Sequence, residues 1–231
     1  MRVAVVGAGG FVGTAVTRAL GSAAVPVTRA NYEEARRSGP FDVLVNAACS
    51  SRRYWARQHP DDDRRETLDT TRALLRDWEW DRFVQISTIS ARTQLDTPYG
   101  RNRAEAEKLC EGHLVVRLGP MYGDSNTKGV LMDILKEQPV YTHGESRQSF
   151  APVEWCGEWV ASHLGAEGVR EVGARTTVSL REIRDAVGSR SVFAGDRNDD
   201  QFPLATEPDW PDAADVIGWL RARSRALTGE S

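Results

Sequence analysis

The sequence predicts an α/β protein with a doubly wound parallel sheet and a small C-terminal lobe. Short apolar runs of strand length alternate with segments of helical periodicity, and the links between them are short. The chain also opens on an apolar run that is followed at once by glycines. At 231 residues it is long enough for one sizeable core, or for a core with a second, smaller lobe.

The first half of the chain supplies the alternation of strands and helices. Predicted strands cover residues 2–6, 23–28, 41–48, 83–87 and 113–118. Predicted helices cover residues 11–20, 64–78 and 98–110. An acidic run at residues 61–63 precedes the second helix, where negative charge complements the helix dipole. Because helical links connect successive strands, we expect the strands to lie parallel and to be covered on both faces.

The pattern loosens after residue 120. Helices are predicted over residues 130–136, 153–164, 178–188 and 210–227, with Pro211 in the first turn of the last one. We therefore assign residues 1–119 to a sheet domain that helix 153–164 completes, and residues 120–231 to the small lobe.

The composition argues against several classes of protein. Net charge is -3, with basic and acidic residues mixed along the chain, so we expect no nucleic-acid groove. No apolar stretch approaches the ~20 residues of a membrane span, and the N-terminus lacks a signal-peptide pattern. We expect no membrane association and a cytoplasmic protein. The 3 cysteines and 4 histidines lack metal-ligand spacing, so we expect free thiols and no metal site.

A glycine-rich turn, GAGGFVG, joins the first predicted strand to the first predicted helix. Gly7, Gly10 and Gly13 give the spacing GxxGxxG, which suits a tight turn and close packing of the helix on the strand. The N–H groups at the helix start, including those of Phe11 and Val12, are then free to bind a pyrophosphate. The motif predicts a Rossmann-type dinucleotide-binding core, with a merely structural glycine turn as the alternative.

The end of the second predicted strand indicates which nucleotide is bound. An acidic residue there would accept hydrogen bonds from the adenosine ribose and favour NAD, but the strand ends VTRANYEE, with Arg29 at that place. A guanidinium suits a 2′-phosphate by its charge and fork geometry. We therefore predict NADP as the cofactor, with NAD as the alternative because an arginine after a strand is common.

Small residues follow the third predicted strand, which ends VLVNAA. Asn46 lies at the carboxyl end of that strand, where open parallel sheets bind ligands, and Ala47 and Ala48 leave room for a cofactor. A turn-forming asparagine is the alternative for Asn46. For Cys49, which comes next, we expect a buried structural thiol.

Five motifs resemble, in order, those of one enzyme family. GAGGFVG, VLVNAA, FVQIST, TPYGRNRAEAEKL and RLGPMYG are similar to segments of the extended short-chain dehydrogenase/reductases. Within that family they resemble the sugar epimerase, dehydratase and reductase branch, such as the GDP-fucose synthases and the dTDP-4-dehydrorhamnose reductases. The likeness covers roughly residues 1–164, and it implies a nicotinamide cofactor and a small-molecule substrate. By analogy, helices 64–78 and 98–110 would pair across a homodimer.

The resemblance implies catalytic roles for Tyr99, which passes a proton to or from the substrate oxygen, and Thr88, which hydrogen-bonds that oxygen. A phenol has a pKa of about 10, so the family places a lysine one helical turn later, which stabilises the phenolate. This chain has Arg103 there, which keeps the charge and can hydrogen-bond ribose hydroxyls but does not release a proton. Pro120 and Tyr122 match a loop that touches the nicotinamide amide in the family, with an ordinary loop as the alternative.

Two departures from the family bear on the substrate. The loop between Thr88 and Tyr99 is short, and Gln148 stands next to Arg147 where family members carry an arginine that holds substrate phosphates. We predict an NAD(P)-dependent oxidoreductase acting on a carbonyl or alcohol of a small polar or sugar-like substrate. The alternatives are a non-catalytic NAD(P)-binding sensor or partner protein, and a sugar epimerase or dehydratase with a recycled cofactor.

Overall fold

The chain forms two compact units in the computed structural model, which describes residues 1–228. Unit 1 contains Met1–Leu118 and Val153–Val172, and unit 2 contains Gly119–Pro152 and the chain from Gly173 onward. Unit 1 is therefore built from two separate stretches of sequence. Within residues 1–228, no helix combines the length and the apolar character that a membrane crossing requires.

Unit 1 contains a six-stranded parallel sheet with the order β2-β1-β3-β4-β5-β9. Its strands are β1 (Val3–Val6), β2 (Ala24–Val27), β3 (Phe41–Asn46), β4 (Trp80–Thr88), β5 (Leu114–Leu118) and β9 (Gly168–Val172). The central strands are apolar and buried, and the predicted doubly wound parallel sheet is confirmed. The sequence pattern does not predict β9, because GVREV is a largely exposed edge strand without an apolar run.

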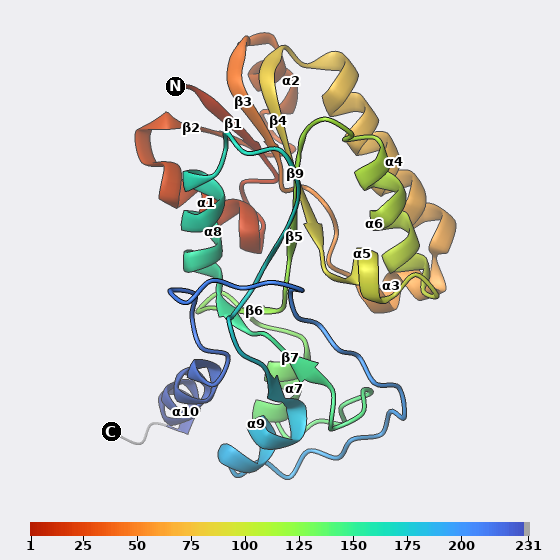
Figure 1. Cartoon of the computed structure of the whole chain (residues 1–231), viewed down its shortest axis with the longest axis vertical. Coiled ribbons are helices and arrows are strands. Elements are labelled where there is room, and N and C mark those ends of the chain that lie inside the picture. The colour runs from red at the N-terminus through yellow and green to blue at the C-terminus, as the bar shows by residue number, and fades with distance from the viewer. Residues whose placement is uncertain (229–231) are drawn as a thin grey trace. The chain divides into compact units, whose positions relative to one another are not determined.

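Helices cover both faces of this sheet (Figure 1). α1 (Phe11–Leu20) packs with α8 (Val153–Ser162) on one face, and α4 (Pro60–Asp77) packs with α6 (Pro98–Lys108) on the other. Gly157 of α8 permits the close approach of α1, because a Cβ there would lie 2.6 Å from the Ala15 carbonyl carbon. The shorter helices of unit 1 are η1 (Gly21–Ala23), α2 (Tyr32–Arg37), α3 (Arg53–Gln58) and α5 (Ser90–Thr93).

Helix α4 begins at Pro60, earlier than the sequence pattern predicts, and takes the acidic run into its first turn. Asp61 and Asp62 are exposed there, where their charges complement the helix dipole as expected. Asp63 is different, because it is completely buried. Dipole complementarity alone does not account for a buried carboxylate.

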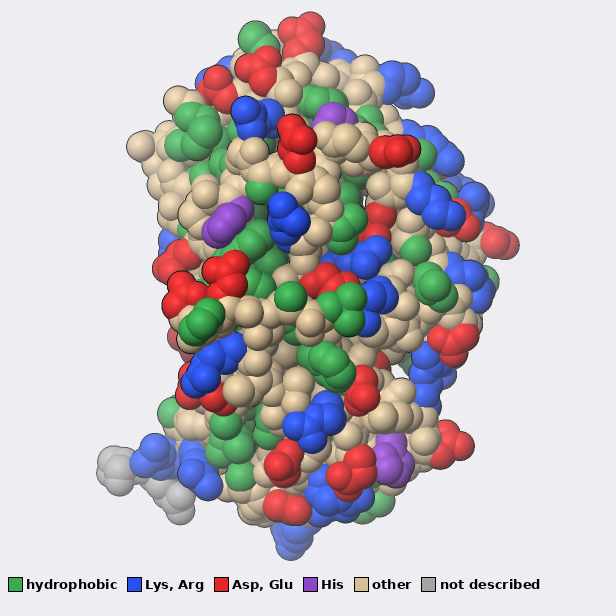
Figure 2. Space-filling model, in the orientation of Figure 1, with side chains coloured by type: hydrophobic (Ala, Val, Ile, Leu, Met, Phe, Trp, Pro, Cys, Tyr) green, Lys and Arg blue, Asp and Glu red, His purple; other side chains and the backbone are tan. Residues whose placement is uncertain are grey.

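Charged side chains of both signs are interspersed over the face shown in Figure 2. On α4, Arg65 pairs with Asp62 at 3.1 Å, and Arg64 reaches Glu105 of α6 at 3.0 Å. The exposed surface of this helix pair is therefore polar and carries its own ion pairs. A homodimer through α4 and α6 stays a prediction.

A largely buried network of charges ties α5 and α6 to three strands. Arg117 of β5 bonds to Glu107 of α6 at 2.6 Å and to Glu171 of β9 at 3.3 Å. Glu107 also accepts a 2.5 Å hydrogen bond from Ser87 of β4, and Glu171 accepts one from Arg92 of α5 at 2.7 Å. The pKa of Arg117 is raised, chiefly by its hydrogen bond with Glu107.

Glu107→Gln should lower the free energy of unfolding by about 3 kcal/mol, because it removes one of the two carboxylates that compensate the largely buried Arg117 guanidinium. Urea unfolding followed by tryptophan fluorescence measures the change. Glu105→Gln is the matched control on the same helix: its side chain is 41% exposed, and its pair with Arg64 should contribute less than about 1 kcal/mol. Equal losses in the two variants would contradict the prediction.

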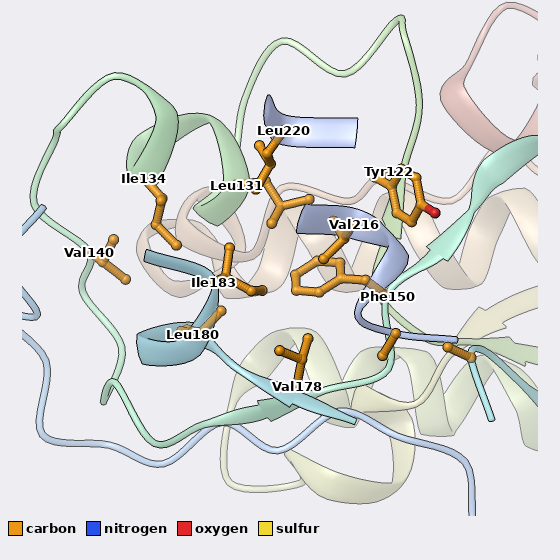
Figure 3. Close-up of a cluster of buried hydrophobic side chains, with 12 residues drawn as sticks. Tyr122, Leu131, Ile134, Val140, Phe150, Val178, Leu180, Ile183, Val216 and Leu220 are labelled. Carbon is orange, nitrogen blue, oxygen red and sulfur yellow. The ribbon is translucent and has the colours of Figure 1, made fainter. Parts of the chain in front are cut away.

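Unit 2 has its own apolar core (Figure 3). Its elements are β6 (Met121–Tyr122), α7 (Val130–Leu135), β7 (Arg147–Gln148), β8 (Ala151–Pro152), β10 (Val178–Ser179), α9 (Leu180–Ala186) and α10 (Asp215–Thr228). β6 pairs with β8, and β7 pairs with β10. Leu131, Ile183 and Val216, one from each helix, belong to a buried cluster with Phe150.

The last helix begins later than predicted. α10 starts at Asp215, so the prediction that Pro211 lies in its first turn is wrong. The cause is Asp212, whose carboxylate accepts hydrogen bonds from the Ala214 N–H at 3.0 Å and from the Thr176 hydroxyl at 2.8 Å. These bonds hold the segment as a turn before the helix.

Candidate active site

Two loops meet at the carboxyl ends of β1 and β3. These strands are neighbours, and β2 lies on the other side of β1, so the strand order reverses here, where open parallel sheets bind ligands. Gly7 follows β1 with a φ of 87°, and a Cβ on it would lie 2.7 Å from the backbone of Ala47 and Ala48. The Ala47 N–H donates to the Val6 carbonyl at 2.9 Å. The two loops are thus packed backbone to backbone.

The glycine loop holds the first turn of α1 close to β1. The Gly10 N–H donates to the Gly7 carbonyl oxygen at 2.9 Å, and a Cβ on Gly13 would lie 2.1 Å from the same oxygen. The N–H groups of Phe11 and Val12 belong to the first helical turn, which offers them no intrahelical acceptor and contains no acidic side chain. This backbone fits the pyrophosphate of a dinucleotide.

Arg29 lies in an exposed turn just beyond the end of β2. Asn31 shapes this turn: its Oδ1 accepts from the Thr28 N–H at 2.7 Å, and its Nδ2 donates to the Pro26 carbonyl at 2.9 Å. Within residues 1–228 no carboxylate pairs with Arg29. The guanidinium is therefore available for an external phosphate, and its assignment to a 2′-phosphate stays a prediction.

Asn46 is completely buried, and its side-chain amide bonds within the protein. Its Nδ2 donates to Gln85 Oε1 at 2.9 Å, and its Oδ1 accepts from the Ala48 N–H at 3.1 Å. Cys49 is half-buried, and its Sγ accepts a hydrogen bond from Gln85 Nε2 at 3.2 Å. Asn46 therefore shapes the loop that carries Ala47 and Ala48, which corresponds to its turn-forming alternative.

Tyr99 is placed in the first turn of α6 by the residues around it. The Thr97 hydroxyl caps the helix, accepting from the Gly100 N–H at 3.1 Å and donating to the Gln94 carbonyl at 2.8 Å, and Pro98 occupies the first turn. A Cβ on Gly100 would lie 2.2 Å from the Gln94 carbonyl oxygen. The turn before the helix is therefore packed directly against it, and Tyr99 is 7% exposed.

Thr88 ends β4, and its hydroxyl oxygen accepts a hydrogen bond from the Ser90 N–H at 3.2 Å. Ser90 Oγ in turn accepts from Arg53 Nη2 at 2.8 Å, and the Arg53 guanidinium carbon lies 5.8 Å from the centroid of the Tyr99 ring. A Cβ on Gly100 would lie 2.7 Å from the Ser90 carbonyl oxygen. Thr88 and Tyr99 thus belong to segments that pack against each other.

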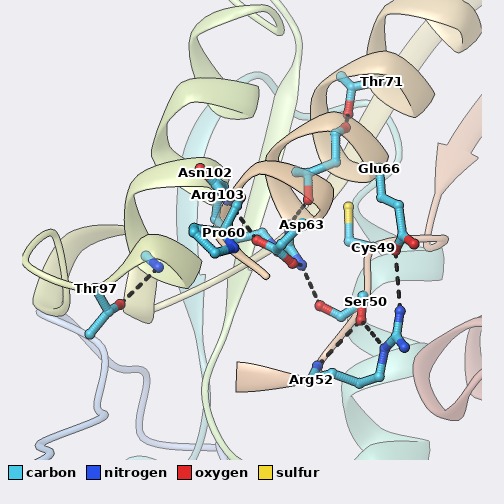
Figure 4. A network of polar contacts seen from close by, with 12 residues as sticks. Cys49, Ser50, Arg52, Pro60, Asp63, Glu66, Thr71, Thr97, Asn102 and Arg103 are labelled. Atoms are coloured by element: carbon cyan, nitrogen blue, oxygen red, sulfur yellow. Dashed lines mark hydrogen bonds and ion pairs between the residues drawn. The ribbon is translucent and has the colours of Figure 1, made fainter. Parts of the chain in front are cut away.

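The Arg103 side chain lies beside the Tyr99 ring and is 2% exposed. Its guanidinium carbon is 4.6 Å from the centroid of the Tyr99 ring, which is a cation–π arrangement. Its Nη1 donates to Thr67 Oγ1, and its Nη2 donates to the Ser50 carbonyl and lies 3.4 Å from Asp63 Oδ1 (Figure 4). The guanidinium is therefore held by acceptors of the protein itself.

The pKa of Arg103 is raised above its ordinary value. Burial lowers it, but the negative charges that Tyr99, Cys49 and Asp63 can carry outweigh that effect. Arg103 is consequently a permanent cation beside the phenol. That it tunes Tyr99 and holds a cofactor ribose stays a prediction.

Sequence reasoning misses Asp63 and Arg53 as members of this cluster. Asp63 is the third residue of an acidic run, and nothing in the run distinguishes it from its two exposed neighbours. Arg53 begins α3, and its place shortly after the segment VLVNAACS is the signal that could have identified it.

The remaining predicted residues belong to unit 2. Tyr122 is 7% exposed, and its ring lies 5.4 Å from that of Trp219 in the apolar core, while the Pro120 carbonyl accepts from the Ala151 N–H at 3.1 Å. Arg147 Nε donates to Thr177 Oγ1 at 2.9 Å, and the Gln148 side chain donates to the Asp199 carbonyl. The roles of Pro120 and Tyr122 toward a nicotinamide stay predictions. Among the described residues, no group of histidine, cysteine and acidic side chains could hold a metal ion.

Solved structures with a similar fold include nucleotide-sugar epimerases and a dehydratase, although the sequence matches no protein-family model and no curated protein. A UDP-glucose 4-epimerase from Thermotoga maritima, in complex with UDP-glucose, has a TM-score of 0.78 at 15% identity over 99% of each chain. TunA, an NAD-dependent NDP-hexosamine 5,6-dehydratase of tunicamycin biosynthesis, has a TM-score of 0.79 at 14% identity over 98% of each chain.

A third similar structure is RMD from Pseudomonas aeruginosa in complex with NADPH, with a TM-score of 0.71 at 16% identity over 99% of this chain and 98% of that one. At these identities the comparisons establish the fold. Together with the order of the five sequence motifs, they show that the chain has the fold of the extended short-chain dehydrogenase/reductases.

Proposed function

We propose that the protein is an NADP-dependent oxidoreductase acting on a carbonyl or alcohol of a small polar, sugar-like substrate. The observation that carries the proposal is the position of Tyr99, which stands in the first turn of α6 over a buried, permanently charged guanidinium. The glycine loop at the carboxyl end of β1 supports a dinucleotide as the cofactor.

The protein residues supply the proton and the orientation of the substrate. When bound, the nicotinamide supplies the hydride that is added to the substrate carbonyl carbon. Tyr99 donates its hydroxyl proton to the carbonyl oxygen, which completes the alcohol. The Thr88 oxygen already accepts from the Ser90 N–H, so its own O–H is available to donate to the same substrate oxygen.

Arg103 acts in this reaction through its charge. A cation beside the ring stabilises the phenolate that remains after proton transfer. A guanidinium does not release a proton, so the proton that Tyr99 gives up returns from solvent and not through Arg103. In the oxidation direction each transfer is reversed, and Tyr99 as phenolate accepts the proton of the alcohol.

An epimerase or dehydratase is the second candidate, because two of the similar structures carry out those reactions by their printed names. Such an enzyme oxidises its substrate and later returns the hydride, so the cofactor is recycled. It would use Tyr99 and Thr88 in the same roles. Net consumption of NADPH distinguishes the first candidate from the second, and product analysis by mass spectrometry and NMR identifies the second.

Titration of the purified protein with NADPH and with NADH, followed by tryptophan fluorescence and calorimetry, is the first test. Tight binding of NADPH supports the proposal and justifies a screen of nucleotide sugars and small polyols or aldoses. Binding of neither cofactor overturns it. Binding without turnover of any compound in that screen would favour a non-catalytic sensor.

Arg29→Gln should weaken NADPH binding about 10-fold or more and leave NADH binding unchanged, because only NADPH carries the 2′-phosphate that the guanidinium would bind. The two dissociation constants measure the effect. Arg37→Gln, on the neighbouring α2 and 76% exposed, is the matched control and should change neither value. A loss of equal size for both cofactors would assign Arg29 another role.

A further inference from the structure

We propose that Asp63 is a positioning residue of the active site, and that it acts by holding Arg103 against Tyr99 and against the loop of residues 47–50. The inference rests on the proposed function for its catalytic meaning. Its structural part, the coupling of Asp63 to that loop through Arg103, can be tested without cofactor or substrate.

The burial of this ion pair calls for a reason beyond stability. Asp63 and Arg103 join α4 to α6 with side chains that are 0% and 2% exposed. Taking two charges out of water costs several kcal/mol per ion, and well-packed apolar residues often serve stability as well or better. The same two helices are already joined in solvent by Arg64 and Glu105, whose side chains are 51% and 41% exposed. A second, buried pair between these helices is therefore better explained by what it orients.

Both oxygens of the Asp63 carboxylate are used on the same turn of α6. Oδ1 lies 3.4 Å from Arg103 Nη2, and Oδ2 accepts a 2.8 Å hydrogen bond from Asn102 Nδ2. Thr67 lies one helical turn after Asp63 on α4 and accepts from Arg103 Nη1. One face of α4 thus holds both terminal nitrogens of the guanidinium, whose carbon lies 4.6 Å from the centroid of the Tyr99 ring.

The guanidinium also holds the loop after β3. Its Nη2 donates to the Ser50 carbonyl, and the preceding residues Ala47 and Ala48 pack against Gly7 of the glycine loop. A single side chain therefore connects the proton-donating tyrosine to the loops where the dinucleotide would bind. Asp63 sets the position of the Arg103 side chain. Loss of Asp63 should therefore weaken both the contact of Arg103 with the loop after β3 and its contact with the Tyr99 ring.

A lysine at position 103 could not make the contacts that Arg103 makes. Its ammonium is one nitrogen at the end of a flexible stem, and it cannot reach Thr67, Ser50 and Asp63 together while presenting a planar face to a ring. Asp63 and Arg103 therefore form a unit, and restoring the lysine that the family uses should impair this protein instead of repairing it.

The test is a double-variant cycle of Asp63→Asn and Arg103→Lys, read by the alkylation rate of Cys49 and by the NADPH dissociation constant. Cys49 belongs to the loop and is half-buried, whereas Cys110 and Cys156 are buried. Burial raises the pKa of both these thiols, that of Cys110 to about 12, so iodoacetamide with mass-spectrometric mapping reports on Cys49.

We expect each single variant to raise the Cys49 alkylation rate and the NADPH dissociation constant at least about 5-fold, with the double variant no worse than the worse single one. Arg64→Lys and Glu105→Gln, the exposed pair across the same helices, should change neither readout. Thr67→Ala removes one hydrogen-bond acceptor of Arg103 without removing a charge, and it should raise both the Cys49 alkylation rate and the NADPH dissociation constant. This variant tests the inference if Asp63→Asn does not fold.

Two outcomes overturn the inference. One is a loss of stability in Asp63→Asn with unchanged Cys49 reactivity and unchanged NADPH binding, which would make the pair merely structural. The other is an Arg103→Lys variant that binds NADPH as tightly as the native protein. If the native protein binds neither cofactor but the effects of the two substitutions on the Cys49 alkylation rate are still not additive, the proposed function fails. The positioning of Arg103 by Asp63 is then still supported. Once a substrate is known, Asp63→Asn should lower kcat in the native background and lower it no further in Tyr99→Phe.

Discussion

Tyr99→Phe should reduce turnover by about 10²–10⁴-fold while leaving the fold and the NADPH dissociation constant unchanged, because it removes only the proton that general acid–base catalysis transfers. The ring that packs over Arg103 is retained, so the cation–π contact and the burial of the guanidinium persist. Steady-state kinetics with the substrate found in the screen, together with cofactor titration, measures both effects.

The matched control for this substitution is Tyr54→Phe. Tyr54 is 73% exposed, and its hydroxyl accepts a hydrogen bond from the Gln58 side chain one turn later on α3. It should show native turnover. Turnover in Tyr99→Phe that is within a few-fold of the native protein would rule out Tyr99 as the acid, and the enzyme interpretation would then lose its central residue.

Gly13→Ala should lower the free energy of unfolding by about 3 kcal/mol and weaken NADPH binding by more than 10-fold. The new Cβ would lie 2.1 Å from the Gly7 carbonyl oxygen and 3.1 Å from the Ala8 Cα, so α1 must move away from the glycine loop. That movement also displaces the N–H groups of Phe11 and Val12. Urea unfolding and cofactor titration measure the two losses.

Gly9→Ala provides the control within the same loop. A Cβ on Gly9 meets no atom within 4 Å, and Gly9 does not require a positive φ. The variant should keep native stability and native NADPH binding. Destabilisation of equal size in both variants would mean that the loop tolerates no side chain at all, and the specific role assigned to Gly13 would be wrong.

The sheet could be predicted from the sequence because its causes are local. β1 is apolar throughout and β3 carries the apolar run VLV, and the spacing of Gly7 and Gly13 predicts the turn between strand and helix. β9 was not predicted, because its residues are mostly exposed and carry no apolar run. Local patterns thus identify strands that carry an apolar run, including β2 at the opposite edge of the sheet, and miss a strand that carries none.

The arrangement around Arg103 could not be predicted, because its partners are distant in sequence. Thr67, Asp63 and the Ser50 carbonyl lie 36, 40 and 53 positions away. The spacing to Tyr99 predicts that the two residues share a helix face, and the structure brings the guanidinium over the ring. Which other groups the guanidinium contacts depends on how α4 packs against α6. The periodicity of apolar residues in the sequence does not predict that packing.

The split origin of unit 1 has a consequence for how the protein folds during synthesis. α8 and β9 complete the helix layer over α1 and the pairing of β5, yet they are translated only after the Gly119–Pro152 stretch of unit 2. Until they emerge, the nascent chain leaves α1 uncovered at Ala15 and leaves β5 as an unpaired edge. Contacts of such long sequence separation also slow folding. The glycine loop is therefore made before α8 and β9, and the sheet that supports it is complete only once both have been translated.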